Sequence, residues 1–388
     1  MDFKLSEEQE MIRQMAQDFV EQKCAPTIEQ RDQDHEFNRA LVNEMAELGF
    51  YGICFPEEYG GLGGDVLSYI LAVEELSKLD DGMGITLSAC VSLCATPIYL
   101  FGTEDQKQKF LRPICEGAKL GAFGLTEPSA GTDASAQKTT AVLKGDKYIL
   151  NGSKVFITNG KEADTYVIFA MTDKSKGNHG ISAFIVEKGT EGFKFGKIET
   201  KMGGNTSITA ELVFEDCAIP KENLLGKEGD GFKIAMVTLD GGRIGVAAQA
   251  LGIAEGALTA AVKYSKEREQ FGRPISAFQA IAFKIADMAI EIDAAKYLVY
   301  HAACLKQEHE TDPSVNYGVA AAKAKCFASD TAMKVTTEAV QVFGGYGYTI
   351  DYPVSRLMRN AKITQIYEGT NEVQRMVVSA SLLKDQKK

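Results

Sequence analysis

A single carboxylate near the end of the chain, Glu368, stands between an aromatic residue and a glycine in the run Tyr367-Glu368-Gly369-Thr370. The run leads into a predicted last helix, Val373 to Leu383. The segment upstream, Val342 to Tyr348, is apolar and rich in glycine, so surroundings of low polarity are expected. Such surroundings raise the pKa of a carboxylate and make it a stronger base near neutral pH, which suits removal of a carbon-bound proton. A surface glutamate before a helix explains the same run.

Two further segments carry groups that suit a flat heteroaromatic ligand. Residues 123–133 contain proline, glycine and two threonines, which predicts an irregular loop with free N–H and hydroxyl groups. An ordinary turn fits this loop as well. In Phe156-Ile157-Thr158 an aromatic ring and a hydroxyl are two residues apart, so alternation along a strand places them on one side. No G-x-G-x-x-G follows a predicted strand, and a Rossmann site is not supported.

Composition limits the classes of protein that the chain can belong to. Its 388 residues, of which 45% are apolar, predict two or three domains with buried cores. The net charge of −11 argues against binding to nucleic acid or to an anionic membrane.

The cysteines and the N-terminus bear on the compartment. The 8 cysteines form no C-x-x-C pair and the 4 histidines are scattered, so buried free thiols in a reducing compartment are expected and structural zinc is not. Residues 1–8 lack the features of a targeting segment, and no apolar run is expected to span a membrane. These observations predict a soluble cytoplasmic protein.

The pattern along the chain predicts an α+β fold in three parts. Residues 1–120 have helical periodicity, with Gly60 to Gly64 as a connector and Asp65 as a helix N-cap. Residues 121–230 predict a small β-barrel or sandwich. Residues 231–388 predict a C-terminal helical bundle.

The β part is predicted from short runs and turn residues. Val142 to Asn151 predicts a hairpin that turns at Gly145-Asp146, and the Asn-Gly pairs at 151–152 and 159–160 predict breaks between strands. Three further strands are expected over Tyr166 to Met171, Ile181 to Val186 and Thr209 to Phe214. In the bundle, long helices are expected over Phe232 to Glu269, with a possible bend at Asp240 to Gly242, Ile281 to Lys306 and Val315 to Val342.

Taken together, the motifs resemble those of the acyl-CoA dehydrogenase family over nearly the whole chain. The matching segments are 123–133, 156–160, Asp240-Gly241-Gly242-Arg243, Arg268-Glu269-Gln270-Phe271-Gly272, Gln341-Val342-Phe343-Gly344-Gly345 and Tyr367-Glu368-Gly369-Thr370. Within the family, segments 64–69 and 171–177 are most similar to bacterial short-chain, or butyryl-CoA, dehydrogenases.

The resemblance implies non-covalently bound FAD. The residues that it implies for the flavin within one subunit are Phe123, Leu125, Thr126, Thr132, Phe156, Thr158 and Thr370. Those that it implies for the FAD of a neighbouring subunit are Arg268, Phe271, Gln279, Gln341 and Gly345. A solvated helix charge explains Arg268, and a polar helix end explains Gln341, equally well. The implied assembly is a homotetramer, a dimer of dimers.

The resemblance also implies a reaction, in which an acyl-CoA thioester is dehydrogenated between its α and β carbons. Glu368 matches the family's base and would take the α-proton, while flavin N5 would accept the β-hydride. Some members carry the base on the helix that holds Gly242 and Arg243, but glycine cannot serve. The backbone N–H of Glu368 and a ribityl hydroxyl of FAD would bind the thioester oxygen.

The implied substrate is a short-chain acyl-CoA. Thr132, Asp240, Arg243 and Gly369 match residues that bind it, although Asp240 and Arg243 also fit a helix ion pair at i,i+3. Ile85 and Ala89, on the helix that also holds Ser88 and Leu93, match residues flanking the acyl tail, and core packing explains them as well.

Three readings stay open from the sequence. The first is an acyl-CoA dehydrogenase for short chains or, alternatively, for acyl groups of another chain length or branching. An electron-transferring flavoprotein is the implied electron partner, and the direction, butyryl-CoA oxidation or crotonyl-CoA reduction, is not fixed. An acyl-CoA oxidase is the second reading, although such chains are usually longer. The third is a flavin-binding scaffold without activity, which would not need a carboxylate at residue 368.

Overall fold

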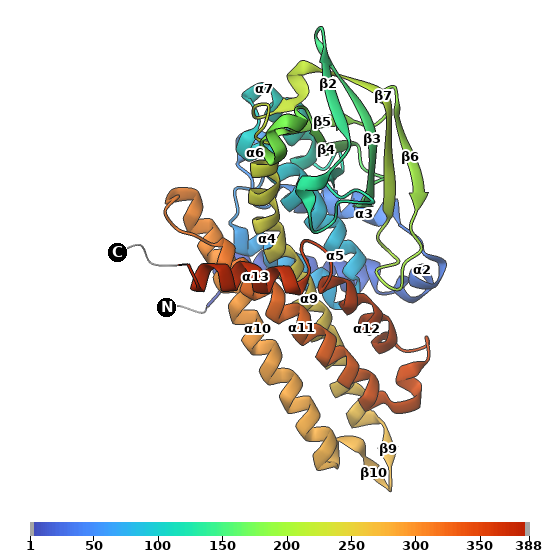
Figure 1. Ribbon diagram of the computed structural model, residues 1–388. Helices are drawn as coiled ribbons and strands as arrows, with labels where there is room; N and C mark the ends of the chain where they lie inside the picture. Colours follow the sequence, from blue (N-terminus) through green and yellow to red (C-terminus); the bar gives the residue numbers. More distant parts are fainter. Residues whose placement is uncertain (1–3, 385–388) are drawn as a thin grey trace.

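The computed structural model describes residues 4–384 and has helices at both ends of the chain with a β-sheet between them (Figure 1). The predicted α+β fold is therefore confirmed. Residues 1–3 of the N-terminal segment considered above lie outside the described residues.

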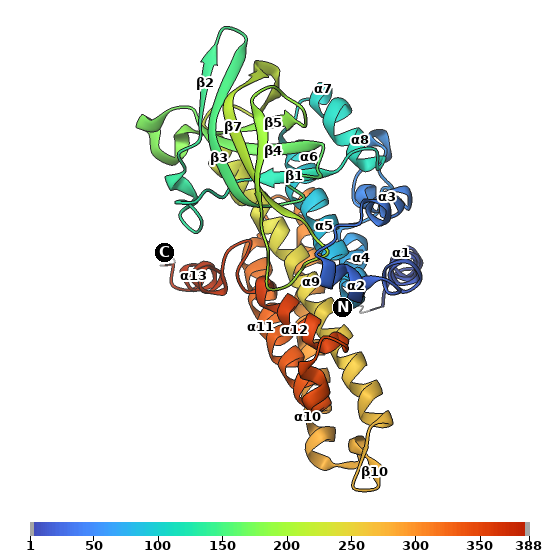
Figure 2. The ribbon, with the colours of Figure 1, turned by 90° about the vertical axis from the view of Figure 1, so that its right-hand side faces the viewer.

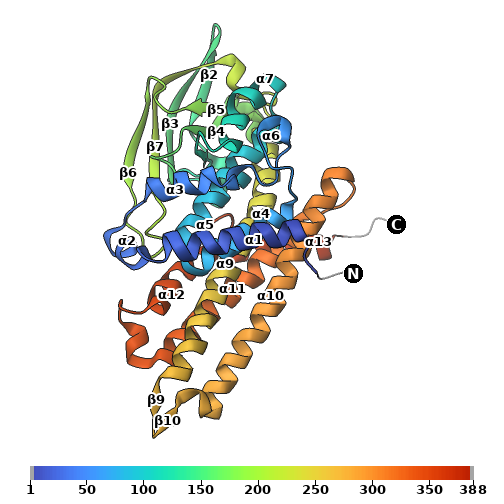
Figure 3. The same ribbon diagram turned by 180° about the vertical axis from the view of Figure 1, so that it is seen from behind.

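The N-terminal helices pack beside the sheet. The α-helices of this part are α1 (Glu7–Phe19), α2 (Ile28–Asp34), α3 (Arg39–Glu47), α4 (Val66–Leu79), α5 (Asp81–Ser88), α6 (Thr96–Phe101), α7 (Glu104–Gln106) and α8 (Arg112–Cys115). Asp65 caps α4 by accepting a hydrogen bond from the backbone N–H of Ser68, as predicted. A π-helical stretch, Ala89–Ala95, joins α5 to α6 without a break. In the rear view, α1 lies across α4 (Figure 3).

The middle part is one eight-stranded sheet with the order β6-β7-β3-β2-β4-β5-β8, and β1 pairs with β4. Its strands are β1 (Gly121–Gly124), β2 (Thr140–Lys144), β3 (Lys147–Thr158), β4 (Thr165–Met171), β5 (Ile181–Glu187), β6 (Phe193–Ile198), β7 (Thr209–Pro220) and β8 (Leu224–Leu225). The predicted hairpin is confirmed, because β2 and β3 pair across Gly145 and Asp146. Figure 2 shows the sheet above the long helices.

Two features of the sheet differ from the sequence-based prediction. Asn151 and Gly152 lie inside β3, so the predicted break there is wrong. The register shifts between Leu150 and Gly152, and the extra residue is absorbed as a bulge. Strands β1 and β6 were not predicted, since β1 is a fully buried run of four residues and β6 alternates with charged residues.

The α-helices of the C-terminal part, as far as residue 384, are α9 (Gly231–Glu267), α10 (Gln279–Thr311), α11 (Gly318–Phe343), α12 (Pro353–Thr364) and α13 (Asn371–Leu382). A two-stranded hairpin, β9 (Glu269–Gln270) and β10 (Arg273–Pro274), joins α9 to α10 at the tip farthest from the sheet (Figure 1). The predicted bend at Asp240 to Gly242 is not a break, because α9 continues through it.

Helix α9 is the central element and packs against α4, α10, α11 and α12. Glycine permits this close packing. A Cβ at Gly252 would collide with the carbonyl of Glu74, and a Cβ at Gly256 with that of Lys78. These two positions let the backbones of α4 and α9 approach each other directly.

The expectation that no apolar run is long enough to span a membrane was wrong. Two helical stretches, Asp81–Phe101 and Gly231–Glu267, reach that length and hydropathy. The most apolar windows of these stretches are 78% and 72% buried inside the protein, as the core helices of a soluble protein are. All eight cysteines lie within the described residues and are free thiols, as expected. Their expected burial is confirmed for five of them and is wrong for the half-buried Cys54 and Cys326 and the exposed Cys304.

Candidate active site

Glu368 lies in the short turn between α12 and α13. Its φ angle is 51° and that of Gly369 is 88°, so two successive residues are left-handed. This conformation is uncommon for glutamate and persists only where surrounding contacts hold it. The side-chain amide of Gln374 supplies such contacts, because its Nε2 donates to the carbonyl of Glu368 at 3.2 Å and to that of Gly369 at 2.8 Å.

The turn itself is half-buried, but the carboxylate points inward. Oε2 of Glu368 is buried and has no hydrogen-bond partner among the described residues. It lies against Gly242 of α9, where a Cβ would collide with Oε2 and would lie 2.8 Å from Cδ2 of Leu93. A surface glutamate does not fit this position. A buried carboxylate oxygen without a partner is available to accept a proton from a ligand.

Burial raises the pKa of Glu368 to about 7, against the opposing effects of Lys325 and Arg243. Near neutral pH the group is therefore poised between its acid and its base. This is the range in which a general base is most effective.

Asp240 and Arg243 form the i,i+3 ion pair that their spacing allows. The side chain of Arg243 is 8% exposed, and its Nε has no partner among the described residues. The ion pair leaves one donor of this buried guanidinium for a ligand. Binding of CoA by these two residues remains a prediction.

The loop after β1 is fixed by a buried lysine that was not singled out from the sequence. Nζ of Lys154 on β3 donates to Oε1 of Glu127 at 2.7 Å, to the carbonyl of Leu125 at 3.1 Å and to Oε1 of Gln137 at 3.0 Å. Glu127 in turn accepts the backbone N–H groups of Lys138 and Thr139. One ammonium group thus ties residues 125–127 to the strand that carries Phe156.

Phe156 is held in an unusual conformation. Its φ is 60° and its side chain is 64% exposed, in a β3 segment where the register shifts between Lys154 and Ile157. Simple alternation therefore does not set the face of Phe156, which was the basis of the prediction. An exposed aromatic ring on a strained backbone suits stacking against a flat ligand, with the half-buried Thr158 on the same strand. Phe123 and Leu125 are each 8% exposed, and Thr126 is half-buried beside them in sequence.

Five predicted flavin residues lie far from this region. Arg268 ends α9, Phe271 is 94% exposed on the hairpin, and Gln279 begins α10. The guanidinium of Arg268 lies 5.5 Å from the ring centre of Tyr346, next to Gly345, and Gln341 is in the last turn of α11. All five are therefore at the bundle end that Figure 3 shows beside β9 and β10.

Helix geometry separates this end from Glu368. Arg268, the residue that follows the last residue of α9, is 26 residues beyond Gly242. At a rise of 1.5 Å per residue the two are about 39 Å apart. The structure thus brings the predicted residues together as two groups, and within one chain these groups do not meet.

The remaining predicted residues have ordinary structural contacts. Thr132 is exposed, and the hydroxyl of Thr370 caps α13 by accepting from the N–H of Val373. Ile85 and Ala89 are buried in the helix that also presents Ser88 to Gly245 and Leu93 to Gly242.

Three buried polar residues around the site were missed from the sequence, namely Lys154, Lys325 and Gln374. A signal existed for Lys325, because it occurs among alanines on the buried side of α11. A charge at an otherwise apolar helix position indicates a specific internal partner.

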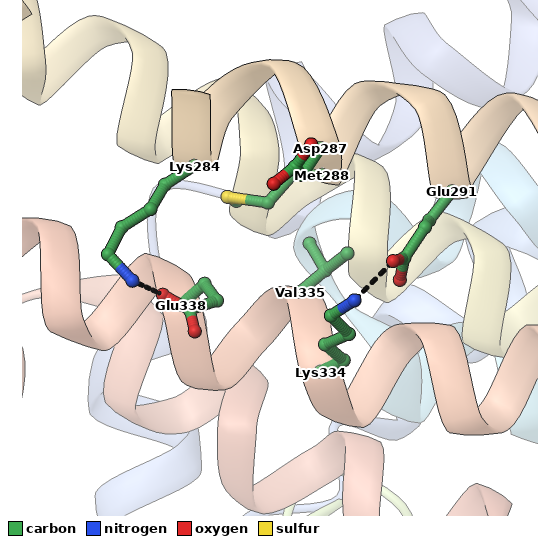
Figure 4. A pocket seen from close by; sticks show the side chains of 7 residues that line it. All are labelled: Lys284, Asp287, Met288, Glu291, Lys334, Val335 and Glu338. Carbon is green, nitrogen blue, oxygen red and sulfur yellow. Dashed lines mark hydrogen bonds and ion pairs between the residues drawn. The ribbon is translucent and has the colours of Figure 1, made fainter. Parts of the chain in front are cut away.

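A surface groove between α10 and α11 is separate from the site. Figure 4 shows two ion pairs across it, Lys284 with Glu338 and Lys334 with Glu291. Lys334 is nine residues from Lys325 along α11, or about 14 Å. The groove contains no residue that was predicted to bind a ligand.

Comparison with known families identifies the class of protein. Three family models match in order: the N-terminal domain of acyl-CoA dehydrogenase at residues 6–118, its middle domain at 122–217 and its C-terminal domain at 229–383. The chain belongs to the acyl-CoA dehydrogenase family.

Individual relatives are similar over their full length. The short-chain specific acyl-CoA dehydrogenase of Megasphaera elsdenii is 63% identical, over 99% of this chain and 100% of the relative. The solved structure of butyryl-CoA dehydrogenase from the same organism has a TM-score of 0.97 at the same identity and coverage. A chain of a solved structure described as the electron-transferring flavoprotein of Acidaminococcus fermentans, in work towards a mechanism of flavin-based electron bifurcation, is 76% identical with a TM-score of 0.97, covering 99% of this chain and 100% of that one.

Proposed function

We propose that this protein dehydrogenates short-chain acyl-CoA thioesters between the α and β carbons, converting butyryl-CoA to crotonyl-CoA or the reverse, with Glu368 as the base. One observation carries the proposal, the buried and unpartnered Oε2 of Glu368 against Gly242. The names of the relatives support the short-chain substrate.

The proton acceptor is assigned to one oxygen of Glu368, Oε2. In the oxidative direction, Oε2 of Glu368 takes the α-proton of the thioester, and the buried surroundings keep water from competing for it. The electron pair of the broken α C–H bond forms the new double bond as the β-hydrogen leaves with its electrons. FAD, when bound, supplies the acceptor for that hydride. The N–H of Glu368 is placed to bind the thioester oxygen in the turn that Gln374 holds.

The residues of the β domain fit FAD. Phe156 offers an exposed ring, Thr158 a half-buried hydroxyl, and the loop that Lys154 anchors offers backbone groups. Within one subunit we assign the cofactor to Phe123, Leu125, Thr126, Thr132, Phe156, Thr158 and Thr370.

The second half of the cofactor site comes from another copy of the chain. Arg268, Phe271, Gln279, Gln341 and Gly345 lie too far from Glu368 to serve their own subunit. A Cβ at Gly344 or Gly345 would meet no atom within 4 Å, so this end is open to a neighbour. Exposed apolar side chains at every seventh residue of α10, Phe283, Ile290 and Tyr297, form a helix face suited to packing between copies. We infer a homotetramer.

The electron partner follows from the same relatives. The likeness to a chain of a structure described as an electron-transferring flavoprotein supports a partner of that kind here. A cytoplasmic location agrees with the free thiols and with the burial of both long apolar helices.

Selectivity for chain length is assigned to the helical stretch 81–101. Ile85 and Ala89 are its proposed tail-flanking residues, with Leu93 beside the carboxylate. Each additional buried methylene would contribute about 0.8 kcal/mol to binding, so rejection of longer chains must come from collision with these side chains.

The test is an anaerobic titration of the purified yellow protein with butyryl-CoA, and octanoyl-CoA in parallel, followed in the flavin absorbance bands. Bleaching by butyryl-CoA and little by octanoyl-CoA is expected. Bleaching only by longer or branched chains would keep the family reaction and overturn the substrate. A protein that binds FAD but responds to no acyl-CoA would leave only the flavin-binding scaffold without activity. Rapid reoxidation by oxygen in the presence of bound product would favour an oxidase.

A further inference from the structure

A buried lysine lies under the turn that carries Glu368. Lys325 on α11 is 0% exposed, and its Nζ donates to the carbonyl of Gly369 at 2.9 Å and to Oδ1 of Asn371 at 3.0 Å. An ammonium group is costly to bury unless it has compensating partners. Its partners here are a backbone carbonyl and an amide, so no carboxylate among residues 4–384 forms a direct salt bridge with it.

The amide that binds Lys325 is itself fixed. Nδ2 of Asn371 donates to Oγ of Ser329 at 2.9 Å and to Oδ1 of Asp330 at 2.8 Å, both on α11. The start of α13 is therefore held to α11 on one side of the turn. Because Glu368 is left-handed, this attachment helps to keep an unfavourable backbone conformation in place.

A neutral group already binds the same carbonyl. Nε2 of Gln374 donates to the carbonyl of Gly369, so hydrogen bonding to that oxygen does not by itself require a lysine. What Lys325 adds is charge. The carboxylate of Glu368 belongs to the adjacent residue, and the two groups influence each other electrostatically.

We propose that Lys325 is a positioning residue for the reaction, which holds the turn of Glu368 and supplies the positive charge that keeps this base ionised in the neutral range. The inference rests on the proposed function of Glu368 and adds a residue that acts through it. Lys325 itself need not touch the substrate.

Other charged and titratable groups surround Lys325 and Glu368. Arg243 on α9 faces Glu368, but its guanidinium is paired with Asp240. Cys326 and Asp330 face Lys325 from its own helix, and Tyr69 and Tyr367 face the carboxylate. Burial lowers the pKa of Lys325 to about 8, with Glu368 opposing, so most of the lysine still carries its charge at pH 7 and below.

The experiment compares the pH dependence of kcat/KM for butyryl-CoA in Lys325→Met, Lys325→Arg and Gln374→Met. In Lys325→Met the acid limb of the kcat/KM profile should move to a pH about one unit higher. At pH 6 this shift lowers kcat/KM about tenfold, in addition to any decrease that is also present at pH 9. Lys325→Arg should keep the limb of the wild type. Gln374→Met, which removes a neutral contact to the same carbonyl, should lower the rate equally at all pH values.

A second readout does not depend on turnover. The titration of the Glu368 carboxylate is followed by infrared difference spectroscopy, with Glu368→Gln as the blank, and should shift up in Lys325→Met. If that variant does not fold, Lys325→Gln keeps a hydrogen-bond donor without the charge and carries the same prediction. An unmoved acid limb and an unmoved carboxylate titration would overturn the role of Lys325. A wild-type protein that butyryl-CoA does not bleach would instead overturn the proposed function.

Discussion

The carboxylate of Glu368 occupies the space that a side chain at Gly242 would need. A Cβ at residue 242 would collide with Oε2 of Glu368, although Gly242 is in α9 and Glu368 is in the turn between α12 and α13. Glycine at 242 and glutamate at 368 therefore form one structural unit, in which the position of the carboxylate depends on the absence of a side chain at residue 242.

Substitution of Gly242 by alanine tests this unit. Gly242→Ala should displace the carboxylate and reduce the rate of flavin reduction by butyryl-CoA roughly 10- to 100-fold, since small displacements of a reacting group have effects of this size. FAD content should be unchanged.

Gly241→Ala is the matched control. A Cβ there would meet only the flexible end of Lys306, at 3.2 Å. Both substitutions should favour the helix by up to about 1 kcal/mol, so helix propensity cannot explain a difference between them. Equal rates in the two variants would refute the steric argument.

Replacement of Glu368 by glutamine should separate catalysis from stability. Activity should fall by at least about 10²-fold, the size of a general-base contribution, while CoA-ligand binding persists. Because burial raises the pKa of Glu368 from 4.5 to about 7, the folded state binds the proton more tightly than the unfolded state. The wild type therefore loses stability as the pH rises from about 4.5 to about 7, and the glutamine variant does not.

Thermal unfolding at pH 5 and pH 8 checks this sign. The unfolding midpoint of Glu368→Gln, relative to that of the wild type, should be higher at pH 8 than at pH 5. A constant difference between the two proteins would mean that Glu368 titrates alike in the folded and unfolded states.

Removal of the ammonium group of Lys154 should loosen the loop after β1, residues 125–127, which we assign to FAD binding. Lys154→Met leaves the carboxylate of Glu127 buried without its cation, a change that typically costs about 3–5 kcal/mol. FAD should be retained less well on gel filtration, and the free energy of unfolding should fall. Lys194→Met is the comparison, since it breaks an exposed pair with Glu215 in the same sheet and should cost less than about 1 kcal/mol. Full FAD retention in Lys154→Met would argue against an anchoring role.

Substitution of Arg268 tests the shared cofactor site. Arg268→Ala should weaken FAD retention without affecting the turn of Glu368, about 39 Å away along α9. The neighbouring Lys266→Ala, at an exposed position, should leave FAD content unchanged. Unchanged flavin content and oligomeric state in Arg268→Ala would contradict the assignment.

The sequence predicted the order of the three parts and the long helices because their periodicity is strong and local. It predicted the hairpin at Gly145 because turn residues there separate two alternating runs. It did not predict the register shifts between β3 and β7, since Asn151-Gly152 is also a turn signal and only the pairing with β7 shows that the strand continues through it. The buried contacts of Lys154 and Lys325 depend on segments up to 46 residues away, which no local pattern specifies.

The length of α9 has a consequence for mixtures of damaged subunits. In one chain, Glu368 and the residues around Arg268 would serve two different cofactor sites. A substitution at Glu368 and a substitution at Arg268 of the same chain would therefore damage different sites. A hybrid oligomer of Glu368→Gln and Arg268→Ala chains would contain some sites in which neither lesion is present. Two alleles that are each defective alone should then restore part of the activity when expressed in one cell.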